Sequence, residues 1–218
     1  MFELQYFIIG IVQGFTEFLP VSSSGHLVLV SQLTSWQDQG LFTDVAVHVG
    51  TLLAVIIYLR SHITTLIKSF FSFQLGNNNN LIKIIIATIP AIFVGIGLKD
   101  YLLGIFDSVK YVGLALLFTG SILILSSKFK HSQKKHSFFS SLAIGLAQAL
   151  AIIPGVSRSG VTISMSIYLG IAPKEAAKFS FLLSIPVILG ASVLGVFELD
   201  NDGMIDSLTI FVAIITSF

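Results

Sequence analysis

Two short stretches of the sequence carry residue types that could do chemistry on an anionic substrate. The first, residues 10–31, contains a carboxylate and an imidazole, Glu17 and His26, whereas the second, residues 145–166, contains the guanidinium of Arg158. A histidine near a serine and a carboxylate can act as a general acid or base. An arginine can hold a phosphate through two parallel hydrogen bonds. Each stretch therefore supplies groups that the other lacks.

The two stretches are copies of one another at a constant offset of 135 residues, as between Gly10 and Gly145. The identical residues are Ile9, Gly10, Gln13, Val21, Ser22, Ser24, Gly25 and Ser31, matched by Ile144, Gly145, Gln148, Val156, Ser157, Ser159, Gly160 and Ser166. The reactive groups lie where the copies differ: Glu17 against Ile152, Ser23 against Arg158, and His26 against Val161. The copies therefore share the glycine, serine and glutamine positions given above, and each carries reactive groups that the other lacks.

Each copy has a proline followed by a cluster of serine and glycine. Pro20 precedes residues 22–25, and Pro154 precedes residues 155–160. Such a cluster is typical of a loop that enters a helix, where free N–H groups and the positive end of the helix dipole suit an anion. Packing is the alternative role for serine in a membrane helix. Two clusters, one of which carries Arg158, favour anion binding.

Gln13 and Glu17 are four residues apart, which places both on one face of a helix. A carboxylate in an apolar segment costs about 2.5 to 3.5 kcal/mol on insertion scales, so it normally lines a cavity or has a partner. An interhelical hydrogen bond is the alternative to a functional role. His48 and Asp44, at the start of an apolar run, are compatible with a structural role. His62, His131 and His136 lie in basic segments and are expected to be solvated, and no convincing metal-ligand set is present.

The composition places the chain in a membrane. Hydrophobic residues make up 54% and charged residues 11%, the mean hydropathy is +0.93, and soluble domains have about 25% charged residues. The apolar runs, most of them near the ~20 residues of a membrane-spanning helix, are Val45–Leu59, Leu81–Leu98, Val109–Leu125, Ala176–Phe197 and Leu208–Phe218. A net charge of +1 argues against a nucleic-acid partner, and the absence of cysteine excludes disulfides and thiolate metal sites.

The signs of the loop charges alternate along the chain. Residues 60–83, residues 128–135 and the pair Lys174 and Lys178 are basic and are expected on the cytoplasmic side. The balanced segment 99–110 and the acidic turn 198–206 are expected outside. The two copies would therefore enter the membrane from opposite faces.

The fold predicted from these patterns is all-α, a polytopic integral membrane protein with an inverted-topology repeat. Proline and glycine break each copy in the middle, and irregular backbone at membrane depth is tolerated only where it is buried or lines a wet cavity. We therefore predict two re-entrant helical hairpins, 4–35 and 138–172, within repeats of about 1–75 and 137–218. Together they form a single membrane domain, 1–218, in an arrangement found in many transporters.

The motifs QGFTEFLPVSSSGH (13–26) and PGVSRSGVT (154–162) resemble the two signatures of the undecaprenyl-diphosphate phosphatases associated with bacitracin resistance. The resemblance covers essentially the whole chain. It implies hydrolysis of a 55-carbon polyprenyl diphosphate to the monophosphate and inorganic phosphate in the bacterial inner membrane, which recycles the lipid carrier for peptidoglycan synthesis. It also implies a divalent cation, Mg2+ or Ca2+. The sequence shows no cage for this metal, and Glu17 is its candidate ligand.

With this resemblance, Ser23 is the predicted nucleophile and Glu17 or His26 the proton acceptor, with the family's first acidic position occupied here by Gln13. Attack by a water that Glu17 or His26 activates is the alternative. Arg158 is predicted to clamp the phosphate; the alternative is a structural ion pair between Arg158 and Glu17. The predicted phosphate-binding residues are Gln13, Ser22, Ser24, Ser157, Ser159 and Thr162.

A transporter or flippase of the same lipid is the rival function, because inverted repeats commonly support alternating access. A carrier has less need of Glu17, Ser23 and His26 together, and a purely structural membrane protein leaves Glu17 and Arg158 unexplained. The resemblance favours a site open to the outer face. Relatives of this kind continue for one or two more helices, so a fragment or a short member is expected. The sequence does not fix the oligomeric state or the preferred lipid length.

Overall fold

The computed structural model describes residues 2–34, 36, 40–71, 79–106, 108–129, 134–197 and 207–218. In chain order its elements are α1 (Phe2–Thr16), α2 (Ser23–Thr34), α3 (Gly40–Tyr58), α4 (Arg60–Phe71), α5 (Asn80–Phe106), α6 (Val109–Ser126), α7 (Phe138–Ala149), the 3-10 helix η1 (Leu150–Ile152), α8 (Arg158–Tyr168), α9 (Pro173–Phe197) and α10 (Ser207–Ser217). The described part of the chain contains no strand, and the all-α prediction is confirmed.

Four helices are long and apolar enough to cross a membrane in the part of the chain that is described. They are α3 over Leu41–Tyr58, α5 over Asn80–Gly97, α6 over Val109–Ser126, and α9 over Pro173–Phe197. Four of the five predicted apolar runs form these helices, whereas the fifth forms the shorter α10 of 11 residues. The protein is therefore a multi-pass membrane protein, as its composition predicts.

Each copy of the repeated motif folds into two helices joined by a break. The first copy forms α1 and α2, and the second forms α7, η1 and α8. Proline cannot donate to the helical ladder, which ends the first arm near Pro20 and the second near Pro154. Ser22 and Ser157 then start the next helices, because their Oγ atoms accept from Gly25 N at 3.3 Å and Gly160 N at 3.1 Å.

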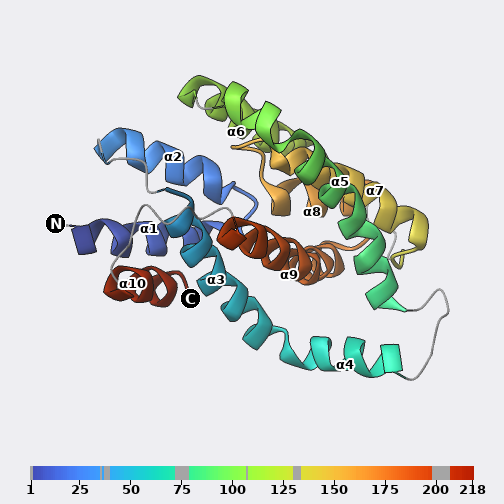
Figure 1. The fold of residues 1–218 in the computed structure, drawn as a ribbon. Helices are drawn as coiled ribbons and strands as arrows, with labels where there is room; N and C mark the ends of the chain where they lie inside the picture. Colours follow the sequence, from blue (N-terminus) through green and yellow to red (C-terminus); the bar gives the residue numbers. More distant parts are fainter. Residues whose placement is uncertain are drawn as a thin grey trace.

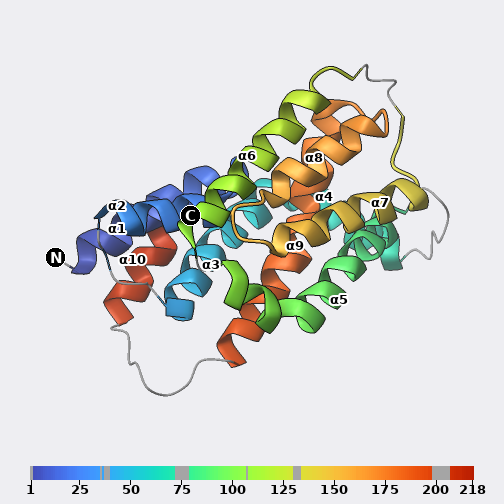
Figure 2. The same cartoon turned by 90° about the horizontal axis from the view of Figure 1, so that it is seen from above.

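The helices form two groups with α9 between them (Figures 1 and 2). One group contains α1, α2, α3 and α10, and the other contains α5, α7 and α8; α9 packs on α3, α5 and α8. The largest apolar core lies among α3, α5, α7, α8 and α9, and its fully buried side chains include Ile144, Ile171 and Leu183. Phe18, from the break of the first copy, packs against this core.

Glycines at matching positions let a neighbouring helix approach each first arm. α1 packs on α10 and α7 packs on α5. A Cβ at Gly10 would meet the Thr216 side chain, and a Cβ at Gly145 would lie 2.5 Å from the carbonyl oxygen of Ala87. These equivalent contacts support the repeat. Its boundaries, the re-entrant depth of the hairpins and their opposite orientation in the membrane stay predictions.

One expectation about the basic segments changes with the structure. Residues 60–71 of the first segment form the helix α4, which leaves its predicted cytoplasmic side untested. The prediction that His136 is solvated is wrong, because its ring stacks on Phe179 with 4.0 Å between the centroids, and burial lowers the pKa of this imidazole to about 4. His131, Asn77, Asn78 and the acidic turn 198–206 lie outside the described residues.

Candidate active site

The breaks of the two hairpins meet, and the contacts between them cross in both directions. The Ser159 hydroxyl donates to the carbonyl oxygen of Leu19 at 2.8 Å, and Gly155 N donates to the Ser24 hydroxyl at 3.4 Å. Arg158 Nη2 lies 2.8 Å from Glu17 Oε1. Residues separated by about half the chain therefore form one cluster.

Glu17 is the centre of this cluster. It follows the last turn of α1, where its N–H donates to the Gln13 carbonyl, so the two side chains share a face as predicted. Oε2 accepts from Gln13 Nε2 at 2.9 Å and from the Ser23 hydroxyl at 2.5 Å, while Oε1 accepts from Arg158. Glu17 as a residue is 8% exposed. A buried charge is costly unless it is paired and hydrogen-bonded, and these three partners satisfy it.

Arg158 is the first residue of α8, so its guanidinium extends from the start of that helix toward the other hairpin. Nη2 donates to Glu17 and Nη1 donates to the Ser180 carbonyl at 3.4 Å. These bonds use two of the five N–H donors of a guanidinium. The observed ion pair is the contact expected for a structural arginine, and it is also compatible with a phosphate clamp that exchanges Glu17 for substrate.

A cavity of about 450 Å3 opens beside the cluster. Its polar end is lined by Glu17, residues 22–24, Ser157 and Arg158. Its remaining walls are mainly apolar and come from α3, α5 and α9, with side chains that include Leu41, Val45, Ile92, Ile96 and Leu194. An anionic group attached to an apolar chain would match this division.

Some of the predicted site residues line the cavity, whereas others make hydrogen bonds to neighbouring residues and do not line it. Gln13 hydrogen-bonds to Glu17, and Ser159 hydrogen-bonds to Leu19. Thr162 shares a 2.7 Å hydrogen bond with Ser180, and its hydroxyl also donates to the Arg158 carbonyl. The ring of His26 is turned to its own helix, with Nδ1 at 2.8 Å from the Ser22 carbonyl. None of these four residues lines the described cavity.

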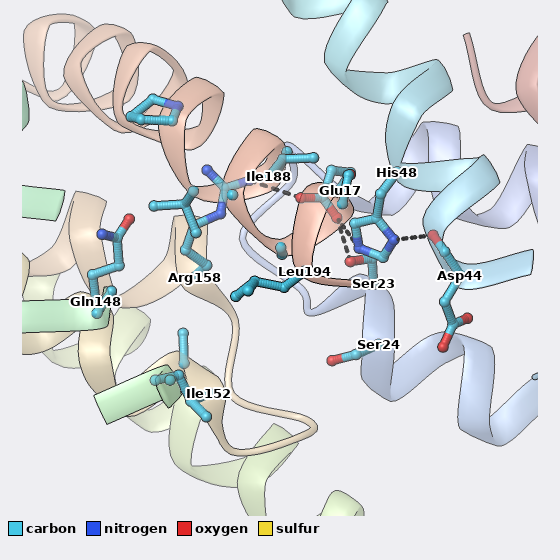
Figure 3. A pocket seen from close by; sticks show the side chains of 18 of the residues that line it. Glu17, Ser23, Ser24, Asp44, His48, Gln148, Ile152, Arg158, Ile188 and Leu194 are labelled. Atoms are coloured by element: carbon cyan, nitrogen blue, oxygen red, sulfur yellow. Dashed lines mark hydrogen bonds and ion pairs between the residues drawn. The ribbon is translucent and has the colours of Figure 1, made fainter. Parts of the chain in front are cut away.

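The cavity also contains residues that the sequence did not assign to it. His48 and Asp44, from α3, and Gln148, from α7, all line it. His48 Nε2 lies 3.7 Å from Glu17 Oε2, and its Nδ1 lies 2.6 Å from the Asp44 carbonyl. Figure 3 shows Glu17 between His48 and Arg158. Two features of the sequence could have identified them. Asp44 and His48 are ionisable residues four apart in an apolar span, and Gln148 occupies in the second copy the position of Gln13 in the first.

The donors in the cavity do not form a dedicated metal site. Mg2+ is usually held by one or two carboxylates together with substrate phosphates. Among the described residues, the carboxylates on the cavity are those of Glu17 and Asp44, and Glu17 is engaged by Gln13, Ser23 and Arg158. Within the described ranges no three His, Asp or Glu residues cluster as ligands. We therefore derive no reaction step through a metal, and the cation implied by the resemblance stays a prediction.

These features define a class: a multi-pass membrane protein in which two helical hairpins build an acid, serine and arginine cluster beside an apolar cavity. Comparison with known proteins then gives the family. The profile described as bacitracin resistance protein BacA matches residues 6–218. Undecaprenyl-diphosphatase 1 of Pseudoalteromonas translucida (strain TAC 125) is 40% identical over 225 residues, which cover 99% of this chain and 84% of the relative. The chain belongs to the bacitracin resistance protein BacA family, and the resemblance predicted from its motifs is confirmed.

Proposed function

We propose that the protein hydrolyses undecaprenyl diphosphate to undecaprenyl phosphate and inorganic phosphate. The observation that carries the proposal is the short hydrogen bond from the Ser23 hydroxyl to Glu17, at the polar end of a cavity with apolar walls. The activity for which the 40% identical relative is named supports it. The reaction would return a lipid carrier to peptidoglycan synthesis in the bacterial inner membrane and would lower sensitivity to bacitracin.

Ser23 is the proposed nucleophile and Glu17 the general base. The Ser23 hydroxyl already points at Oε2 of Glu17, so the carboxylate takes its proton as Oγ attacks the terminal phosphorus. The bond between this phosphorus and the bridging oxygen breaks, and the lipid monophosphate leaves with the electron pair. Water then hydrolyses the phosphoserine, which releases inorganic phosphate and restores Ser23. Between the two steps Glu17 passes its first proton to the departing lipid monophosphate; it then accepts a proton from this water and returns one to Ser23 Oγ as the phosphoserine bond breaks.

Arg158 is the proposed phosphate clamp. In the structure it neutralises Glu17, and it starts α8, whose first N–H groups and dipole also suit an anion. An incoming diphosphate would compete with Glu17 for the guanidinium and accept two parallel hydrogen bonds from it. Transfer of Arg158 to the phosphate would leave Glu17 with a stronger attraction for the Ser23 proton. Binding of substrate and activation of the nucleophile would then be one event.

Direct attack by water is the alternative route, since the same carboxylate can orient a water molecule instead of Ser23. The two routes differ in one covalent intermediate. A slow variant such as Arg158→Lys, quenched during turnover and analysed by mass spectrometry, should carry phosphate on Ser23 if the serine attacks. The absence of a phosphoserine while product forms would favour the activated water.

Phosphate release by the purified protein in detergent separates the phosphatase from the transporter or flippase. The wild-type protein should release phosphate from undecaprenyl diphosphate, and Ser23→Ala should lose this activity. Ser121→Ala is the matched control, because Ser121 is an exposed serine of the membrane helix α6 that donates only to its own helix. A carrier would release no phosphate in any of the three samples, which would contradict the proposed function.

A further inference from the structure

His48 lies at the polar end of the cavity, on the other side of Glu17 from Arg158 (Figure 3). It belongs to α3, outside both copies of the repeated motif. Its side chain is 30% exposed and lines the cavity, with Nε2 at 3.7 Å from Glu17 Oε2. His26 differs in both respects, because its Nδ1 contacts the Ser22 carbonyl and its side chain does not line the described cavity.

The hydrogen bond at the other nitrogen fixes the tautomer of His48. Nδ1 lies 2.6 Å from the carbonyl oxygen of Asp44, and a carbonyl can only accept, so Nδ1 carries a proton. In the neutral ring Nε2 is then a bare acceptor facing a carboxylate oxygen. In the imidazolium form, Nε2–H is a donor directed toward Glu17 and the cavity. The geometry therefore suits a positively charged His48.

The neighbouring charges are the ones that a donor at Nε2 would face. The ionisable groups near the ring are Glu17 beside α1, Asp44 on α3, and Arg158 beyond Glu17. The neighbouring helix α10 carries no ionisable residue. The ionisable residues of α9 lie in its first two turns, at Lys174, Glu175 and Lys178. They are far along the helix from the residues of α9 that line the cavity, 186–194. With His48 neutral, Arg158, Glu17 and Asp44 sum to −1, and the imidazolium brings the sum to 0. A bound diphosphate adds negative charge here, which an Nε2–H donor on this side of Glu17 would meet.

We propose that His48 is a substrate-binding residue, whose Nε2–H donates to a phosphoryl oxygen of the diphosphate from the side of Glu17 opposite to Arg158. The inference rests on the proposed function, because it takes the anion in the cavity to be a lipid diphosphate. Two cationic donors would then flank the general base. His48 would contribute mainly to binding, while Glu17 and Ser23 carry the proton transfer and the attack.

The first test uses a non-hydrolysable ligand, farnesyl methylene-diphosphonate, titrated calorimetrically into the purified protein in detergent. His48→Leu should raise the Kd and the KM by at least about tenfold, the effect expected for a lost hydrogen bond to a charged group. His48→Gln should bind within about threefold of wild type, because its amide N–H reaches the position of Nε2. His62→Leu, an imidazole of α4 that does not line the cavity, is the matched control.

A second readout separates ligand binding from a structural role. The KM of His48→Leu should rise together with the Kd, while its kcat stays within about threefold of wild type, a split that a general loss of structure would not produce. If His48→Leu is unstable in detergent, His48→Asn takes its place, because the shorter amide keeps the Asp44 contact but does not reach the ligand.

An unchanged Kd in His48→Leu or His48→Asn would overturn the inference. A fall in kcat with unchanged Kd and KM would also overturn it, since His48 would then act on Glu17 and not on the substrate. The result is separable from the proposed function. If the wild type binds the diphosphonate through His48 but releases no phosphate from undecaprenyl diphosphate, the phosphatase proposal fails and the binding role stands.

Discussion

The tips of the two hairpins, which are the breaks around Pro20 and Pro154 with the residues beside them, have similar backbones and differ in the side chains that they present. Ser22 and Ser157 both cap a helix, and each lies near a second serine hydroxyl, at 3.3 Å for Ser24 and 3.1 Å for Ser159. One tip then presents a carboxylate and a hydroxyl, whereas the other presents a guanidinium. Both tips place the start of a helix where it can bind an anion. A few side-chain differences between them are enough to give one site with a carboxylate, a hydroxyl and a guanidinium.

The tips also differ in where the chain takes a left-handed conformation. In the second tip Gly155 has a φ of 91°, which glycine adopts without strain. In the first tip the residue is Ser22, with a φ of 67°. A left-handed residue other than glycine costs about 1 to 3 kcal/mol and tends to cluster at functional sites. The strain lies directly before Ser23, in the tip that carries the proposed nucleophile and base.

The largest effect is expected from removing the charge of the first tip. Glu17→Gln should lower kcat by at least about 100-fold, because a neutral amide cannot take the Ser23 proton. The variant should still insert into membranes and bind the lipid diphosphate. Phosphate release and ligand binding by the purified variant check both statements, with Glu175→Gln, an exposed glutamate in the first turn of α9, as the control. Retention of more than about a tenth of the activity would remove Glu17 from the proton transfer.

A smaller effect is expected from changing the shape of the cation in the second tip. Arg158→Lys keeps the charge but replaces a planar two-pronged donor with a point charge. It should lower kcat by at least about tenfold, which corresponds to ~1.4 kcal/mol of transition-state stabilisation. Steady-state kinetics against Arg60→Lys, an exposed arginine at the start of α4, measures the difference. Near-normal kcat, together with restored folding in the Glu17→Gln and Arg158→Leu double variant, would make Arg158 a structural partner of Glu17.

The matching glycines test the repeat through stability instead of activity. Gly145→Ala should destabilise by about 1 to 3 kcal/mol, because the new Cβ meets the Ala87 backbone. Gly10→Ala should destabilise as well, because the new Cβ meets Oγ1 and Cβ of Thr216. Thermal unfolding in detergent compares both with Gly113→Ala, where nothing lies within 4 Å of the added Cβ. A melting temperature of Gly145→Ala equal to that of Gly113→Ala would contradict the close packing of α7 on α5.

The opposite orientation of the copies predicts a labelling pattern. Single cysteines in the segment 128–135 and in the segment 200–206 should react with a membrane-impermeant thiol reagent from opposite sides of the membrane. The chain has no native cysteine to interfere. Reaction of both from one side would break the comparison between the tips, because the hairpins would then enter from the same face.

The sequence predicts the parts of the structure that follow from local rules. Hydropathy gives the spans, proline and the serine clusters give the breaks, and the spacing of Gln13 and Glu17 gives their shared face. The spacing of Asp44 and His48 signals a polar face on α3, but whether this face lines the cavity is decided by the packing of α3 on α1, α9 and α10. The burial of His136 against Phe179 likewise depends on a contact between distant segments. Local periodicity locates the elements, and tertiary packing decides which of their polar residues reach the cavity.

The central claim is that the two tips form one catalytic unit through Glu17 and Arg158, and a double-mutant cycle on single-turnover phosphate release tests it most directly. If the two residues act together, their effects are not additive. The Glu17→Gln and Arg158→Lys double variant should then release phosphate within about threefold of the rate of Glu17→Gln alone. A double variant slower by the full product of the two single losses would contradict the account, because the tips would then act independently.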